Sequence, residues 1–164
     1  MDEQKYERVV WGGGLVLDVE RVLMVCNRWP EGEVWALPGG FSPPGEPLPE
    51  TVRRELREEA GLEVEVGSLA YVVENFWPPD ERGVSAHALA FVFHLRALSG
   101  PVGVRDPDGW VQEARWVPMA ELESYLEPAR RHGWRGFWEP LLDCICIGER
   151  SWGAEFYSYD GLGE

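Results

Sequence analysis

The sequence of 164 residues contains no run of about 20 consecutive apolar residues, and its N-terminus lacks the basic and apolar segments of a signal peptide. We therefore expect neither a membrane span nor secretion, and we place the protein in the cytoplasm. Cysteine is scarce too. The sequence has three cysteines, an odd number, and no sign of secretion, so we expect reduced thiols at Cys26, Cys144 and Cys146. Cys144 and Cys146 have no second pair nearby, which argues against a zinc site.

Basic residues are also few. The sequence has 15 lysines and arginines against 29 aspartates and glutamates, and its formal net charge is −14. Such a surface repels nucleic-acid backbones, so we do not expect binding to an extended nucleic acid. A small phosphorylated substrate can still bind, because divalent cations held by carboxylates reverse the local sign of the charge.

Internal repeats, linkers and low-complexity stretches are absent, so nothing supports a second domain. With 45% hydrophobic and 27% charged residues, the composition is that of a folded globular protein. We expect a single domain over residues 1–164. The tail at 148–164 is aromatic and glycine-rich, and the alternatives for it are a final strand, an ordered lid and a loose end.

The first part of the sequence predicts two strands and a loop. Residues 9–17 and 21–26 are rich in β-forming side chains, and the segment between them predicts a tight turn. The glycines at 12–14 indicate a bulge or the close approach of another backbone. Three prolines and a glycine make 41–47 a loop.

The second part predicts further strands followed by helices. Partly alternating apolar residues predict strands over 62–75 and 87–98, and a short strand over 114–117. Helical spacing continues over 119–126 and 130–145, with a glycine near the start of the second helix. Strands and helices together indicate an α/β protein.

Between these parts, residues 49–60 predict a helix, with proline in its first turn and Gly61 at its end. At 100° per residue, one face of roughly 100° carries three glutamates, Glu55, Glu58 and Glu59. An adjacent apolar stripe can dock the helix on a sheet; it consists of Val52, Leu56 and Ala60. A solvated acidic face is the alternative interpretation.

Three neighbouring carboxylates repel one another unless a cation lies among them, and ligands that are all oxygen favour Mg²⁺ or Mn²⁺. Such ions neutralise phosphate oxygens and lower the pKa of a bound water so that it can attack phosphorus. The helix therefore indicates a hydrolase of phosphate anhydrides.

The surrounding residues make the pattern specific. Gly40, five residues, Glu46, seven residues, and then Arg54-Glu55-Leu56-Arg57-Glu58-Glu59-Ala60-Gly61-Leu62 resemble a complete Nudix box at all nine constrained positions. The resemblance implies an α/β/α sandwich with a mixed β-sheet. It also implies that the three glutamates bind the metal, that the Gly40 carbonyl adds a ligand, and that Arg54 and Glu46 support them. For Glu46 the alternatives are that it holds the loop against the helix and that it takes part in proton handling. Pairing between Arg54 and Glu58, one turn on, would orient the latter.

The resemblance leaves the general base open. Members of the family use either a glutamate of the box or a residue from a later loop. Glu113, just before the strand at 114–117, is our first candidate outside the box, and Asp106 and Asp108 are others. Pro43 departs from the acidic residue that many members carry in the loop, which puts one outer ligand in doubt. We assign no role to the three histidines.

Substrate recognition is expected outside the box, where aromatic side chains can stack on a base. Of the nine tryptophans, Trp77 is the best candidate, since it precedes two prolines on a loop after a strand. Pro78 lies sixteen residues past Leu62, a spacing that resembles the ADP-ribose pyrophosphatase subgroup. The turn itself explains that proline equally well.

The leading hypothesis is Mg²⁺-dependent hydrolysis of the diphosphate linkage in a nucleoside diphosphate derivative. ADP-ribose or a nucleotide sugar is favoured over a nucleoside triphosphate. The rival hypotheses are a Nudix-like nucleotide sensor without turnover, and a non-nucleotide diphosphate hydrolase or isomerase on the same scaffold. The implied partner is a small-molecule nucleotide, and the family also suggests a homodimer.

Overall fold

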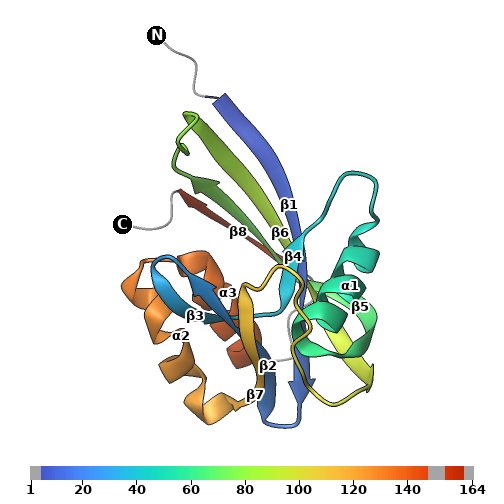
Figure 1. Cartoon of the computed structure of the whole chain (residues 1–164). Coiled ribbons are helices and arrows are strands. Elements are labelled where there is room, and N and C mark those ends of the chain that lie inside the picture. The colour runs from blue at the N-terminus through green and yellow to red at the C-terminus, as the bar shows by residue number, and fades with distance from the viewer. Residues whose placement is uncertain (1–4, 148–153, 161–164) are drawn as a thin grey trace.

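The computed structural model describes residues 5–147 and 154–160. Within them, eight strands form one mixed sheet, with helix α1 on one face and helices α2 and α3 on the other (Figure 1). The predicted α/β class, sandwich architecture and mixed sheet are confirmed. No described helix is both long enough and apolar enough to cross a membrane.

The strands are β1 (Lys5–Asp18), β2 (Arg21–Trp29), β3 (Gly32–Ala36), β4 (Gly39–Phe41), β5 (Glu63–Trp77), β6 (Val84–Ser99), β7 (Val111–Pro118) and β8 (Glu155–Asp160). Their order across the sheet is β3-β2-β1-β6-β5-β8, with β4 also paired to β1 and β7 to β2. The pairs β1–β6 and β5–β8 are parallel, and the others are antiparallel.

Helix α1 (Leu48–Ala60) matches its prediction within one residue. Pro49 occupies the first turn, where its missing N–H leaves no donor unsatisfied. At the other end Gly61 adopts φ 69°, and its N–H donates to the Arg57 carbonyl. This left-handed residue ends the helix because side chains other than glycine are strained there.

The glycine run at 12–14 allows close approach on both faces of β1, as one of the two sequence interpretations proposed. A Cβ on Gly13 would lie 2.5 Å from the Pro38 carbonyl oxygen and still nearer the Trp11 ring. A Cβ on Gly12 would lie 2.7 Å from Leu48 of α1. The glycines therefore bring both β4 and α1 against the middle of β1.

The two late helices are α2 (Leu122–Arg131), which follows a 3₁₀ turn at Met119–Glu121, and α3 (Arg135–Ile147). The sequence predicted that the second helix starts at residue 130, which is wrong, because α2 continues to Arg131 and α3 begins only at Arg135. Gly133 has φ 70° and stops α2, and the Trp134 N–H donates to the Ala129 carbonyl. The buried Trp134 side chain holds this break in place, which the helical spacing alone did not reveal.

Among the described residues the core divides into three clusters, and the two larger ones lie on opposite faces of the sheet. The cluster under α1 contains Val52 and Leu56, whose side chains are fully buried, as the predicted apolar stripe required. The cluster under α2 and α3 contains Leu122, Leu126 and Leu141. Strand β8 accounts for part of the C-terminal tail, while 148–153 and 161–164 lie outside the described residues.

Candidate active site

The three glutamates of α1 lie beside strand β4 at the edge of the core. Glu59 is 7% exposed, whereas the side chains of Glu55 and Glu58 are 12% and 28% exposed. The predicted common face is thus present, and it is partly shielded from water. Such shielding makes uncompensated negative charge costly.

Arg54 is the main positive partner of this face. Its Nη1 lies 2.6 Å from Glu55 Oε1 and 3.3 Å from Glu58 Oε2, so the predicted pair with Glu58 is present. The Arg54 Nη2 also donates to Glu46 Oε1 at 3.1 Å and to the Phe41 carbonyl at 3.4 Å. One guanidinium therefore ties the loop, β4 and two of the glutamates together.

Glu46 holds the loop before α1. It accepts hydrogen bonds from Arg54 and, at 2.5 Å, from the Thr51 hydroxyl, and these two interactions, that with Arg54 first, keep the pKa of Glu46 below its ordinary value. Thr51 is fully buried and its hydroxyl also bonds to Ser42. Glu46 therefore contacts the structural elements of the site, as a supporting residue would.

The glycines of β4 bring backbone and carboxylates together. A Cβ on Gly40 would lie 2.3 Å from Cδ of Glu55, so only glycine leaves room for that carboxylate. One residue earlier, the Gly39 N–H donates to Glu59 Oε2 at 2.7 Å. Gly40 is thus needed for space beside Glu55, whatever its carbonyl binds.

Burial raises the pKa values of two of these carboxyl groups. For Glu59 it raises the pKa to about 9, despite the hydrogen bond from Gly39, and the charges of Glu55, Asp106 and Glu58 add to the effect. For Glu55 burial again raises the pKa, while Arg54 opposes the shift. These groups lie close enough to resist ionising together unless positive charge is added.

The segment 101–110 connects β6 to β7 and packs on the end of α1. The Gly103 N–H and the Arg105 N–H donate to carbonyls in the last turn of α1 at 2.9 and 2.6 Å. Helix ends leave such carbonyls without intrahelical partners, so the loop has a fixed attachment there.

This attachment brings Asp106 close enough to the glutamates to interact with them electrostatically. The negative charge of Asp106 contributes to the raised pKa values of Glu55 and Glu59. The Asp106 carboxylate accepts from the N–H groups of Asp108 and Val111 at 3.0 and 2.8 Å, which fixes its orientation. Asp108 is exposed in the same turn.

Glu113, our first candidate outside the box, is not brought to the glutamate face. Its carboxylate bonds to Arg115 at 2.7 Å, and Arg115 in turn bonds to Tyr125 of α2. The alternate β7 residues, Ala114 and Trp116, pack in the core cluster under α1. Because successive side chains on a strand point to opposite faces, Glu113 lies on the α2 side of the sheet. The geometry therefore favours Asp106 over Glu113 as a base.

No three acidic, histidine or cysteine side chains among the described residues converge into a ready-made cation site. The reason is local: Arg54 holds Glu55 and Glu58, while the Gly39 N–H holds Glu59. The donor set still fits Mg²⁺ or Mn²⁺, because it is all oxygen and carries negative charge that is poorly solvated. Cation binding would require Arg54 to release its two glutamates.

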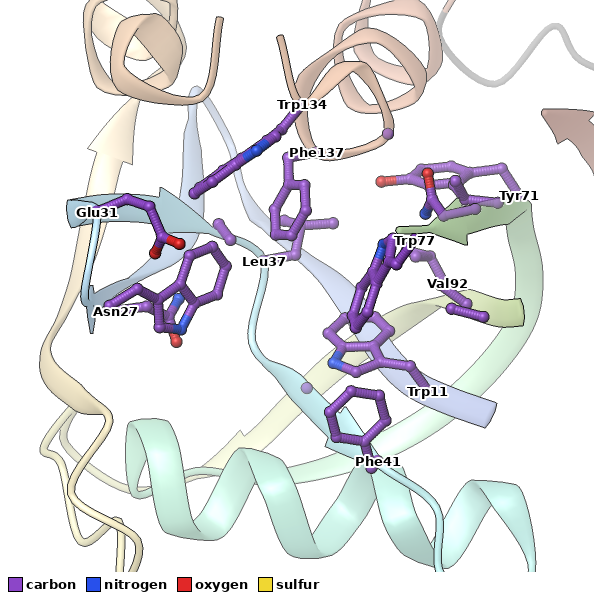
Figure 2. A pocket seen from close by; sticks show the side chains of 18 residues that line it. Trp11, Asn27, Glu31, Leu37, Phe41, Tyr71, Trp77, Val92, Trp134 and Phe137 are labelled. Carbon is purple, nitrogen blue, oxygen red and sulfur yellow. The ribbon is translucent and has the colours of Figure 1, made fainter. Parts of the chain in front are cut away.

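A cavity of about 390 Å³ opens beside the glutamates, and Gly39 and Phe41 of β4 line it. Tryptophans 11 and 77 project into the cavity from the sheet, and Trp134 and Phe137 from the α3 side (Figure 2). Such an aromatic enclosure suits a planar ligand. Its size lies within the range of sites for small molecules.

Trp77, predicted as a substrate contact, thus lines the cavity, although it ends β5 rather than lying on a loop. Its neighbour Pro78 is exposed and is not among the lining residues. Sequence reasoning missed the other walls, because Trp11, Trp29 and Trp134 belong to distant segments. The large number of tryptophans was the available signal, but nothing in the sequence says which of them meet.

A family model for the NUDIX domain matches residues 9–136. The chain belongs to the NUDIX family. The matched span runs from β1 to the start of α3, and so includes the glutamate helix, the 101–110 loop and most of the cavity walls.

Two curated NUDIX relatives illustrate the likeness. The chain is 36% identical over 115 residues to the 8-oxo-dGDP phosphatase NUDT18 of Mus musculus, covering 69% of this chain and 32% of that protein. It is 31% identical over 132 residues to the mitochondrial NAD(P)H pyrophosphatase NUDT13 of Homo sapiens, covering 77% and 35%. The chain thus spans about a third of the length of these relatives.

Among solved structures, the chain resembles a MutT NUDIX hydrolase from Burkholderia pseudomallei with a TM-score of 0.56 and 32% identity. That likeness covers 68% of this chain and 84% of the other.

Proposed function

We propose that this NUDIX protein hydrolyses the diphosphate linkage of a nucleoside diphosphate derivative, with Mg²⁺ or Mn²⁺ held by Glu55, Glu58 and Glu59. The observation that carries the proposal is the shielded carboxylate face of α1 beside an aromatic cavity. Such cations, when bound, neutralise phosphate oxygens and activate water. ADP-ribose or a nucleotide sugar is preferred to a nucleoside triphosphate as substrate.

The relatives support this substrate class. By their names, one acts on 8-oxo-dGDP and another on NAD(P)H, both of which contain a nucleoside joined to a diphosphate. NUDIX hydrolases generally use divalent cations such as Mg²⁺. A possible homodimer and the cytoplasmic location stay predictions.

Other residues of the chain orient the glutamates, accept a proton and bind the rest of the substrate. Arg54 orients Glu55 and Glu58 in the absence of a cation and is available to a phosphate oxygen when they turn away. Asp106 is the candidate for removing a proton from the attacking water, because the loop attached to α1 carries it and two backbone N–H groups orient it. The cavity binds the part of the substrate attached to the diphosphate.

Glu58→Gln and Glu59→Gln test the proposal. Each should lower kcat by several orders of magnitude in a screen of nucleoside diphosphate sugars and triphosphates with Mg²⁺, because each removes a negative charge from the cation site. Glu59→Gln should keep the fold, since the amide oxygen can still accept from the Gly39 N–H. Circular dichroism and thermal melting check the fold.

The matched control is Glu50→Gln, an exposed carboxylate on the same helix that pairs with Arg53. It should leave turnover unchanged. Wild-type rates in both site variants would contradict the proposal, and binding of nucleotides without any turnover by the wild-type protein would point to a sensor instead.

A further inference from the structure

The sequence contains only two asparagines, Asn27 and Asn75, and both line the aromatic cavity. They reach it from different walls, since Asn27 lies on β2 and Asn75 on β5. These strands are separated in the sheet by β1 and β6, so no local sequence feature explains why both residues meet there.

Neither carboxamide hydrogen-bonds to another side chain or backbone group in the described part of the chain, although both residues are half-buried. A half-buried amide without an internal partner must bond to water or to a ligand. Gln112, by contrast, lies outside the cavity and donates to the Gly109 carbonyl. The two asparagines therefore offer donors and acceptors to whatever enters the cavity.

Asn75 is held by its surroundings. A Cβ on Gly136, at the start of α3, would lie 2.9 Å from Asn75 Oδ1 and 3.1 Å from Nδ2. The carboxamide thus packs against the Gly136 backbone. A polar group held in this way can discriminate between ligands, because it cannot turn freely to suit each of them.

The rest of the lining restricts the ligand further. Seven of the 18 described residues that line the cavity are aromatic, and Glu31 is the only charged residue among these 18. Because the described lining holds no lysine, arginine or histidine, a phosphate group would enter against the negative charge of Glu31 and find no cationic partner among these residues. The cavity therefore suits a neutral, planar group with hydrogen-bonding edges.

We propose that Asn27 and Asn75 hydrogen-bond to the edges of a nucleobase stacked in this cavity, and that they determine which base the enzyme accepts. The inference rests on the proposed function, because it assigns the diphosphate to the α1 glutamates and the base to the cavity beside them. Carboxamides present a donor and an acceptor together, so a base with the wrong pattern leaves one of them unpaired.

The test uses the full chain with Mg²⁺ and four substrates that differ only in their base: ADP-, GDP-, CDP- and UDP-glucose. The wild-type enzyme should prefer one base by about tenfold or more in KM. Asn27→Leu and Asn75→Leu keep the branched shape and the number of heavy atoms of the side chain and remove the hydrogen bonds. Each should raise KM for the preferred substrate about five- to tenfold and reduce the preference, with kcat within about twofold of wild type.

Gln112→Leu is the matched control, since it removes a carboxamide outside the cavity and should not alter base preference. If a leucine variant fails to fold, the corresponding Asn→Asp variant keeps the shape, replaces the donor by an acceptor oxygen and adds a negative charge, so it also changes the pattern offered to the base. Equal KM values for the four substrates, or an unchanged preference in the variants, would overturn the inference and leave the proposed function standing.

Quenching of tryptophan fluorescence by the four free nucleosides gives a readout that does not need catalysis, because several tryptophans line the cavity. Base-selective quenching in the wild type that is lost in the variants supports the inference even if no diphosphate is hydrolysed, and in that case only the proposed function fails. Quenching without selectivity among the nucleosides counts against the inference.

Discussion

Gly40 lies directly under the carboxylate of Glu55, and this contact gives a physical reason for glycine at the first position of the motif. Its φ is not in the left-handed region, so backbone freedom is not the reason. Any Cβ would lie 2.3 Å from Cδ of Glu55 and displace the carboxylate from β4.

We predict that Gly40→Ala lowers kcat about 100-fold, because a shift of about 1 Å in a catalytic group has an effect of that size. Steady-state kinetics with the preferred nucleotide sugar measure it. Gly103→Ala is the control, since a Cβ there meets no atom within 4 Å. If Gly40→Ala were as active as Gly103→Ala, the prediction would be wrong, because Glu55 would then tolerate displacement from β4.

At the scale of elements, strand positions and loop attachments decide which acidic residues meet. Helix α1 carries three of them, and the 101–110 loop adds Asp106 because its backbone bonds to the last turn of that helix. Glu113 is only seven residues further along the chain, but strand alternation turns it toward α2.

A second polar cluster joins three strands outside the active site. Glu74 of β5 lies 2.7 Å from Nε2 of His87 on β6 and accepts from the hydroxyl of Ser158 on β8 at 3.0 Å. His87 also stacks on Phe76, with ring centroids 4.5 Å apart. The bond to His87, followed by that to Ser158, holds the pKa of Glu74 below its ordinary value, and the charge of Arg8 adds to this effect.

We predict that Glu74 makes stability depend on acid pH. A carboxyl group with a lowered pKa in the folded state stabilises the fold above its ordinary pKa of 4.5, and this contribution disappears as pH falls through the lower value. Urea unfolding of wild type and Glu74→Gln should differ at pH 7 and converge only when the pH falls below the lowered pKa of Glu74. Exposed Glu81→Gln should match wild type throughout. A gap that persists at low pH would contradict the assignment.

At the scale of the whole molecule, the net charge of −14 and the poorly solvated carboxylates of α1 act in the same direction. Both disfavour the folded state when no cation is bound, because negative charges are kept close together. A ligand that binds only the folded state stabilises it in proportion to the logarithm of its concentration.

We therefore predict that near-saturating Mg²⁺ or Mn²⁺ raises the melting temperature by about 5 to 10 °C for a chain of this size. Sodium chloride at matched ionic strength serves as the comparison for general screening. Glu58→Gln should show a smaller divalent effect than wild type. The same rise with either salt would mean that the cations act on net charge and occupy no specific site.

Much of the fold could be predicted because its signals are local. The ends of α1 follow from Pro49 and Gly61, and the glutamate face follows from helical periodicity. The boundary between α2 and α3 could not be predicted in this way. There the left-handed Gly133 and the buried Trp134 act against a continuous apolar pattern, and only packing decides between them.

The sequence by itself determined that a helix would present Glu55, Glu58 and Glu59 together, since residues three and four apart share a face wherever the helix lies. Only the tertiary structure decided that Asp106 joins them, that Glu113 does not, and that Asn27 and Asn75 share one cavity. The physical reason is distance along the chain. Contacts between remote segments depend on strand order, register and close approach at small residues, and these are properties of the assembled sheet.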